Sequence, residues 1–208
     1  IISSDEFESS EALNQVVSGL SKVPLLLKLM KVCPITDLEF EAFFTKLRLS
    51  LLLNISNFPN DVDILEFQIA LAIQCSITEY IYAETETDKK AVESLVQSIE
   101  GKKHNSSLLT MNEVACLGSY KDLHQYPFSQ NLIEIFGENE LLNVQIHERE
   151  VEIDIKPKIA CFGKVNNEIS LQVREQYEQS PYPKWINLCL PFDAKSISEV
   201  AKELDLRF

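Results

Sequence analysis

The stretch "VREQYEQSPYPKW" (residues 173–185) concentrates side chains that can contact a ligand or a neighbouring domain. It contains Tyr177, Tyr182 and Trp185, the last being the only tryptophan of the chain, and it is interrupted by a Pro-Tyr-Pro sequence. Tyrosine and tryptophan combine a large apolar ring with one polar group, which makes them effective anchors for packing and for binding. This segment is therefore the first candidate for a functional site.

Two interpretations of the segment remain open. In the first, it only ends a helix, because each proline disfavours the helical conformation of the residue before it. Tyr182 and Trp185 then fold back as apolar anchors. In the second, a rigid aromatic elbow presents Arg174, Tyr177 and Tyr182 to a neighbouring site or domain.

A second group of polar residues surrounds His147 in the sequence "IHEREVE", with Glu148, Glu150 and Glu152 close behind it. A zinc-binding helix of the H-E-x-x-H type needs a second histidine one turn later, and this sequence has none there. The favoured interpretation is a solvated acidic segment. We therefore predict no metal site.

The cysteines indicate free thiols. Their number is odd, their spacing is wide, and no C-x-x-C pair occurs, which favours a reducing compartment, here the cytoplasm, over a disulfide framework. No local sequence marks any of them as an activated nucleophile, and we predict no catalytic residue in this chain. The positions are Cys33, Cys75, Cys116, Cys161 and Cys189.

The composition excludes several classes of function. With only 5 glycines among 208 residues, the chain has no glycine-rich loop of the kind that holds a nucleotide-type cofactor. The formal net charge of −13 opposes binding to nucleic acid or to an anionic membrane. No uninterrupted apolar run approaches the ~20 residues of a transmembrane helix. We expect no cofactor in this chain, and neither nucleic acid nor membrane as its partner.

Apolar periodicity predicts a mostly α-helical fold. One helix is expected to begin near Thr36, which forms a capping-box pattern with Glu39, and to carry an apolar stripe from Phe40 to Leu51. Residues 62–83 are apolar on almost all sides, as expected of a central, buried helix. Gly101 is expected just after the end of another helix. Further helices are predicted at 11–32, 87–100, 106–118, 129–137, 138–148, about 166–179 and from Ser196 onward.

One segment favours a different structure. Residues 149–160 alternate polar and apolar side chains, as a β-strand does, so the fold class is an irregular helical domain with one candidate β segment there. The expected organisation is a helical bundle core over 1–118 and an irregular connecting region over 119–165. A helix, the Pro-Tyr-Pro elbow and a terminal helix follow over 166–208.

The segment 173–185 resembles the R-x-Q-Y-E-x-x-P-Y-P-[RK]-W sequence of bacterial proteins that join tetratricopeptide repeats to a class I S-adenosylmethionine-dependent methyltransferase domain. In that family the segment lies just ahead of the catalytic domain. "FFTKLRLSLL" (43–52) is similar to a leucine- and arginine-bearing helix of the family, and residues 146–170 fit a weaker region. "ALAIQCSITEYIY" (70–82) resembles another of its helices but departs at Ser76 and Thr78, where an aromatic residue and an asparagine are expected.

The resemblance implies a non-catalytic helical module within a larger methyltransferase that uses S-adenosylmethionine. Its implied partners are the adjacent methyltransferase domain and the repeat domain of the same polypeptide, and an apolar surface left exposed in isolation favours a homodimer. No cofactor-binding residue can be transferred, because the family's cofactor motif would follow Phe208. The alternative is a stand-alone helical protein–protein interaction module. The implied lid or substrate contacts are Arg174, Gln176, Tyr177, Tyr182 and Trp185.

Overall fold

The computed structural model describes residues 10–57, 62–102, 109–160 and 167–179, together with Ser196, Ser198, Glu199 and Lys202. Regular structure in these residues is helical throughout, which confirms the predicted fold class. The helices are α1 (Ser10–Ser21), α2 (Pro24–Val32), α3 (Leu38–Leu53), α4 (Val62–Ile77), α5 (Glu86–Lys102), α6 (Met111–Gly118), α7 (Ser129–Phe136), α8 (Glu140–Leu142), α9 (Glu148–Ile155) and α10 (Glu168–Gln179).

The helix termini show how local sequence sets these boundaries. The side chain of Asp37 caps α3, because its Oδ1 accepts hydrogen bonds from the backbone nitrogens of Glu39 (2.9 Å) and Phe40 (3.1 Å). The expected cap at Thr36 is thus wrong by one residue. The expectation for Gly101 is also wrong, since α5 continues through Lys102.

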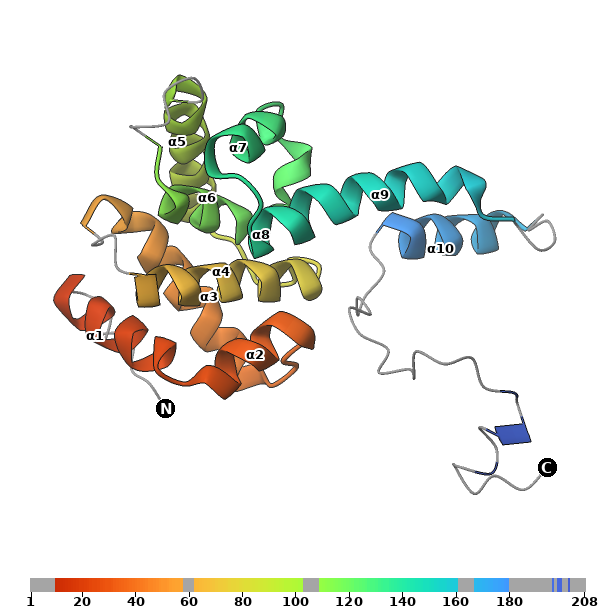
Figure 1. Ribbon diagram of the computed structural model, residues 1–208, viewed down its shortest axis with the longest axis horizontal. Coiled ribbons are helices and arrows are strands. Elements are labelled where there is room, and N and C mark those ends of the chain that lie inside the picture. The colour runs from red at the N-terminus through yellow and green to blue at the C-terminus, as the bar shows by residue number, and fades with distance from the viewer. Residues whose placement is uncertain are drawn as a thin grey trace.

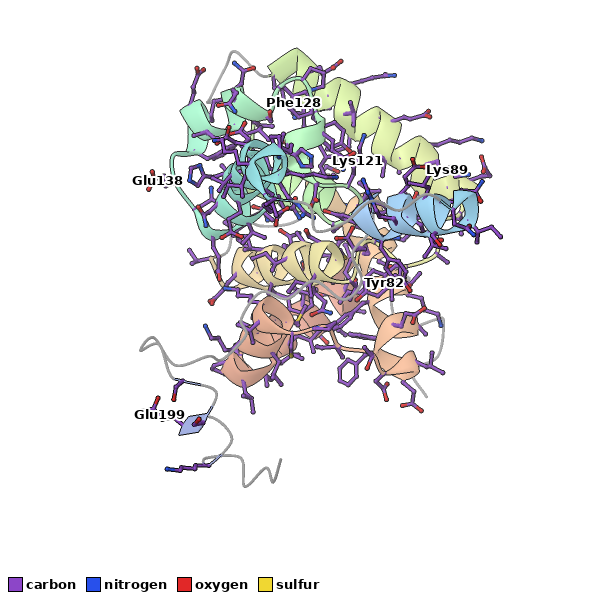
Figure 2. All side chains as sticks on the ribbon, turned by 90° about the vertical axis from the view of Figure 1, so that its right-hand side faces the viewer. Tyr82, Lys89, Lys121, Phe128, Glu138 and Glu199 are labelled. Carbon is purple, nitrogen blue, oxygen red and sulfur yellow. The ribbon has the colours of Figure 1, made fainter. Side chains whose placement is uncertain are left out.

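Helix α4 is the centre of the bundle, as its all-round apolar sequence predicts. It packs against α1 and α2 on one side and against α6 and α8 on the other (Figure 1). Figure 2 shows these two sides from a second direction, with side chains filling the space above and below α4. The core that results includes Phe44 and Leu47 of α3, Phe67 and Leu71 of α4, and Leu117 of α6.

The hydrophobic core continues beyond residue 118. Leu123, Phe128 and Leu132 are buried, and so are Leu141 and Ile146. The helices expected near 129–137 and 138–148 are present as α7 and as α8 with its continuation. Much of the segment expected as an irregular connection therefore packs as part of the bundle.

The candidate β segment at 149–160 is wrong. Residues Glu148–Ile155 form α9, and Lys156–Lys158 add a 3-10 turn. An isolated strand is not stable without a neighbour to pair with, and the described residues contain no strand. A helix forms instead because α8 and a π-turn over Asn143–His147 lead directly into it, and extending an existing helix avoids the cost of nucleation.

The π-turn carries a buried glutamine that ties three helices together. Gln145 is fully buried, and its Nε2 donates hydrogen bonds to the carbonyl oxygens of Ala72 in α4 (3.1 Å) and Gly118 in α6 (2.8 Å). Gly118 permits this contact, because a Cβ at that position would lie 2.8 Å from Gln145 Oε1. A Cβ at residue 118 would therefore force the side chain of Gln145 to move.

Replacing Gly118 with alanine should destabilise the protein by about 1–3 kcal/mol, because the added methyl group forces a buried, hydrogen-bonded side chain to move. Urea unfolding followed by circular dichroism measures this change. Gly101→Ala is the matched control: no atom lies within 4 Å of its Cβ, so the alanine should stabilise α5 by roughly 0.5–1 kcal/mol. Equal stability of the two variants would contradict the proposed packing.

Candidate functional site

Helix α10 carries three of the five side chains that the sequence singles out. Arg174, Gln176 and Tyr177 lie on it and are exposed, whereas Tyr182 and Trp185 lie outside the described residues. The helix forms as predicted. Its first turn is capped by Asn167, whose Oδ1 accepts hydrogen bonds from the backbone nitrogens of Ile169 (2.9 Å) and Ser170 (3.4 Å).

The apolar row of α10 is exposed. Ile169, Val173 and Tyr177 recur every four residues, which places them on one side of a helix, and they are 70%, 45% and 66% exposed. Figure 1 shows α10 beyond the bundle, near the end of α9 that lies farthest from α4. A row of this kind normally faces a core, so α10 presents an apolar surface.

Helix α9 also exposes apolar side chains outside the bundle. Its Val151, Ile153 and Ile155 are all more than a third exposed, and no side chain of this helix is fully buried. Soluble proteins rarely leave neighbouring apolar side chains uncovered unless they contact another surface. Together α9 and α10 form the exposed apolar arm, defined here as residues 148–155 and 168–179.

A cluster of charged residues fixes the arm to the bundle at the beginning of α9. Arg149 donates hydrogen bonds to Asp122 Oδ2 from Nε (2.9 Å) and from its second terminal nitrogen (2.8 Å). It also pairs with Glu152 (2.6 Å) and approaches Glu79 (3.5 Å). We refer to Glu79, Asp122, Arg149 and Glu152 as the Arg149 cluster. It links α4, the turn after α6 and α9.

Asp122 is the centre of the cluster, and protein groups saturate its oxygens. Oδ1 accepts hydrogen bonds from the Ser76 hydroxyl (2.6 Å) and the Tyr80 hydroxyl (2.7 Å), while Oδ2 accepts those of Arg149. Asp122 is only 3% exposed. A carboxylate whose lone pairs are all engaged in this way organises its neighbours and is poorly placed to accept a proton from a substrate.

The backbone beside the cluster adopts an uncommon conformation. Glu79 and Tyr80, just after α4, have φ angles of +51° and +56°. This left-handed region costs roughly 1–2 kcal/mol per residue for side chains other than glycine. Glycine would avoid the cost but could not supply the carboxylate that faces Arg149 or the phenol that binds Asp122. Strain retained at such a place is a reason to look for function there.

The surroundings of Glu79 change its proton affinity. Its side chain is 13% exposed. Burial raises the pKa of this carboxyl group to about 7; the nearby Arg149 opposes the increase, and Asp122 and Glu152 reinforce it. Burial also raises the pKa of Tyr80 well above its ordinary value, so the phenol stays protonated and donates its hydrogen bond. Glu79 therefore changes charge near neutral pH.

A second buried polar site lies between α3 and the turn that follows α6. Arg48 of α3 is 1% exposed and donates hydrogen bonds to the carbonyl oxygens of Ser119 (3.1 Å), Ala83 (3.3 Å) and Tyr82 (3.4 Å). Its guanidinium carbon lies 4.1 Å from the centre of the Tyr120 ring, a cation–π contact. Arg48 thus holds three chain segments together.

Two of the three cysteines that the structure describes are buried in the core. Cys75 and Cys116 are buried, and desolvation raises the pKa of each thiol to about 12. Such thiols pack as small apolar side chains at neutral pH. Among the described residues, no three His, Cys, Asp or Glu side chains are grouped as a metal ion requires.

A groove of about 640 Å³ lies between the end of α3, α5 and the beginning of α6. Ser94 and Ser98 of α5 line it together with Lys102, which pairs with Glu113. Asn112 Nδ2 lacks a hydrogen-bond partner among the described residues, but this atom is shielded from solvent and cannot reach a molecule in the groove. The groove therefore shows no defined recognition chemistry.

Arg48, Asp122 and Arg149 were not identified as site residues from the sequence. Three of the four stretches on which the family expectation rests include Arg48, Glu79 and Arg149. In the structure these stretches meet: Arg48 contacts Tyr82, and Arg149 contacts Glu79. Ser76, where the sequence departs from the family, supplies a hydrogen bond to Asp122.

Comparison with known proteins adds no family. No protein-family model, curated protein or solved structure matches this chain. Of the helices in the described part of the chain, none has both the length and the apolar character needed to cross a bilayer.

Proposed function

We propose that this chain is a non-catalytic helical module of a larger, cytoplasmic methyltransferase that uses S-adenosylmethionine. The bundle formed by α1–α8 is its rigid body, and the exposed apolar arm contacts the adjacent catalytic domain. The observation that carries the proposal is the row Ile169, Val173 and Tyr177, which lies outside the bundle and is between 45% and 70% exposed.

Two features support the choice of partner. The row leads directly into the sequence that resembles the family's segment ahead of its catalytic domain, so the next domain along the chain is the nearest surface to cover it. Three of the four stretches that resemble the family, 43–52, 70–82 and 146–170, also meet in space around Arg48 and Arg149. A module whose packing depends on the stretches that resemble the family is expected to have the family's order of domains as well.

The polar side chains of α10 suggest a role beyond attachment. Arg174 and Gln176 lie next to the apolar row, and Tyr177 belongs to it. We propose that these three residues, with Tyr182 and Trp185, contribute to a lid over the substrate pocket of the catalytic domain. Lids of this kind exclude water and hold the substrate in place, so they affect turnover more than fold stability.

In the parent polypeptide, Tyr177→Ala should lower the rate of methyl transfer at least about tenfold, equivalent to roughly 1.4 kcal/mol of transition-state stabilisation. The thermal unfolding midpoint of residues 1–208 alone should stay unchanged, because Tyr177 is 66% exposed in this chain. The assay follows transfer of a labelled methyl group from S-adenosylmethionine.

Glu175→Ala is the matched control for this variant. Residue 175 lies two positions from Val173 and therefore roughly 200° around the helix, on the opposite side. It should leave the rate unchanged. Equal rates in the wild type and in Tyr177→Ala would remove the lid role. The coding sequence after residue 208 tests the module itself: a glycine-rich strand–turn–helix supports it, whereas a stop codon favours the stand-alone interaction module.

A further inference from the structure

The Arg149 cluster contains more negative than positive charge. One guanidinium lies within 2.8 Å of Asp122, 2.6 Å of Glu152 and 3.5 Å of Glu79. Two of these carboxylates are largely buried: the side chains of Asp122 and Glu79 are only 4% and 13% exposed. When all three are ionised, the cluster carries excess negative charge in a place where water screens it poorly.

The cluster also lies where α9 leaves the bundle. Before Arg149, the continuous helix is held by Leu142, Gln145 and Ile146, all of them buried. After Arg149, every described side chain of α9 is at least partly exposed, and the apolar arm begins. Beyond it, Glu150 accepts only an exposed hydrogen bond from Gln130 of α7 (2.6 Å), so Arg149 makes the last largely buried contact that the described residues show between the arm and the bundle.

We propose that the Arg149 cluster is a pH-responsive joint, in which ionisation of Glu79 loosens the attachment of α9 to the bundle. The joint concerns this chain alone and does not depend on the identity of the partner domain. Its consequence is that the arm is held more firmly under mildly acidic conditions than under mildly alkaline ones.

The direction of the effect follows from the proton affinities of the two states. With the joint closed, burial raises the pKa of Glu79 to about 7. With the joint open, Glu79 is hydrated and returns to the ordinary value of about 4.3–4.5. Glu79 therefore binds a proton more tightly in the closed state. The extra stability that this gives the closed state relative to the open state is lost as pH rises through about 7. Linkage with these values predicts that the opening constant increases about tenfold between pH 6 and pH 8.

The contribution of Glu79 to the pH dependence must be distinguished from the contributions of other charged groups nearby. Arg149 and Glu152 face it from α9, Asp122 faces it from the turn after α6, and Tyr80 follows it at the end of α4. His124 and His147 belong to the neighbouring segments Leu123–Gln125 and Asn143–His147. A variant that alters only Glu79 keeps all of these groups, so the difference from the wild type isolates its contribution.

The test is hydrogen–deuterium exchange of the full chain at pH 6 and pH 8, with rates corrected for the intrinsic pH dependence of exchange. In the wild type, amides of Glu148–Ile155 should exchange about tenfold faster at pH 8, whereas those of α1 should not change. In Glu79→Gln, which imitates the protonated carboxyl group, the increase should disappear. Asp154→Asn, an exposed change on the same helix, should retain it.

Two outcomes would overturn the proposal. One is the same increase in Glu79→Gln as in the wild type, which would assign the effect to a histidine or to general destabilisation. The other is no increase in the wild type. Carboxyl ¹³C NMR of the wild-type chain gives a readout that needs no variant: the midpoint of Glu79 should lie near 7, and a midpoint near 4.5 would equally exclude the joint.

Discussion

Replacing Arg48 with methionine should lower the free energy of unfolding by about 3–5 kcal/mol. Methionine fills similar space, but it offers no donor to the carbonyl oxygens of Ser119, Tyr82 and Ala83, which the guanidinium satisfies. Buried carbonyl groups that lose their donor cost roughly 1–3 kcal/mol each before relaxation. The cation–π contact with Tyr120 is lost as well. Urea unfolding followed by circular dichroism measures the loss.

The variant Arg48→Lys separates the contribution of the planar guanidinium group to stability from the contribution of its positive charge. Lysine keeps the charge but cannot stack on Tyr120 and reach carbonyl groups in three directions, so we expect about half of the loss. Lys46→Met on the exposed side of the same helix is the control, and it should change stability by less than about 0.5 kcal/mol. An Arg48→Met variant within 1 kcal/mol of the wild type would show that the guanidinium is not needed.

The environment of Tyr120 explains why one buried positive charge is tolerated there. The hydroxyl group of Tyr120 donates a hydrogen bond to Asp88 Oδ1 (2.8 Å), so a carboxylate lies one side chain away from Arg48. Burial opposes ionisation of Asp88, but hydrogen bonds from Thr85 and Tyr120 and the charge of Arg48 hold its pKa below the ordinary value. The ring of Tyr120 thus separates two opposite charges that stabilise each other.

The helices could be predicted from the sequence where one periodic pattern dominated. The apolar stripe from Phe40 to Leu51 predicted α3. Residues 62–83, which are apolar on almost all sides, predicted α4 as the central helix. The sequence also contains the capping box of α6, Thr110 and Glu113 three residues apart, although the helix was expected from residue 106. These features depend on neighbours within about one helical turn, which a sequence shows directly.

The polar sites could not be predicted because their partners are distant in the chain. Arg48 and Ser119 are separated by 71 positions, and Asp122 and Arg149 by 27. Only the packing of α6 against α3 and α4, and of α4 against α8 and its continuation, brings these residues together. The segment 149–160 was misjudged for a related reason. Its alternating pattern came from an exposed arm with apolar residues on more than one side, and no core selects one face of it.

Replacing Asp122 with asparagine should destabilise the protein by about 3 kcal/mol, because one change removes several hydrogen bonds and an ion pair. If the amide oxygen of the asparagine accepts from Ser76 and Tyr80, its NH₂ group faces the donors of Arg149, and two donors cannot bond to each other. If the amide is reversed, the hydroxyl groups of Ser76 and Tyr80 lose their acceptor. Neither orientation satisfies the site.

A double-mutant cycle with Arg149→Gln separates the ion pair from the rest of this loss. The two changes should couple by about 1.5 kcal/mol or more, because removal of Arg149 leaves fewer donors for the asparagine to oppose. Asp154→Asn should cost less than about 0.5 kcal/mol, because its exposed carboxylate pairs, among the described residues, with Lys158 one turn away on the surface. Additive effects of Asp122→Asn and Arg149→Gln would mean that α9 is held mainly by Gln145 and the apolar contacts before it. The arm would then open without regard to charge, and the pH dependence expected of Glu79 would vanish with it.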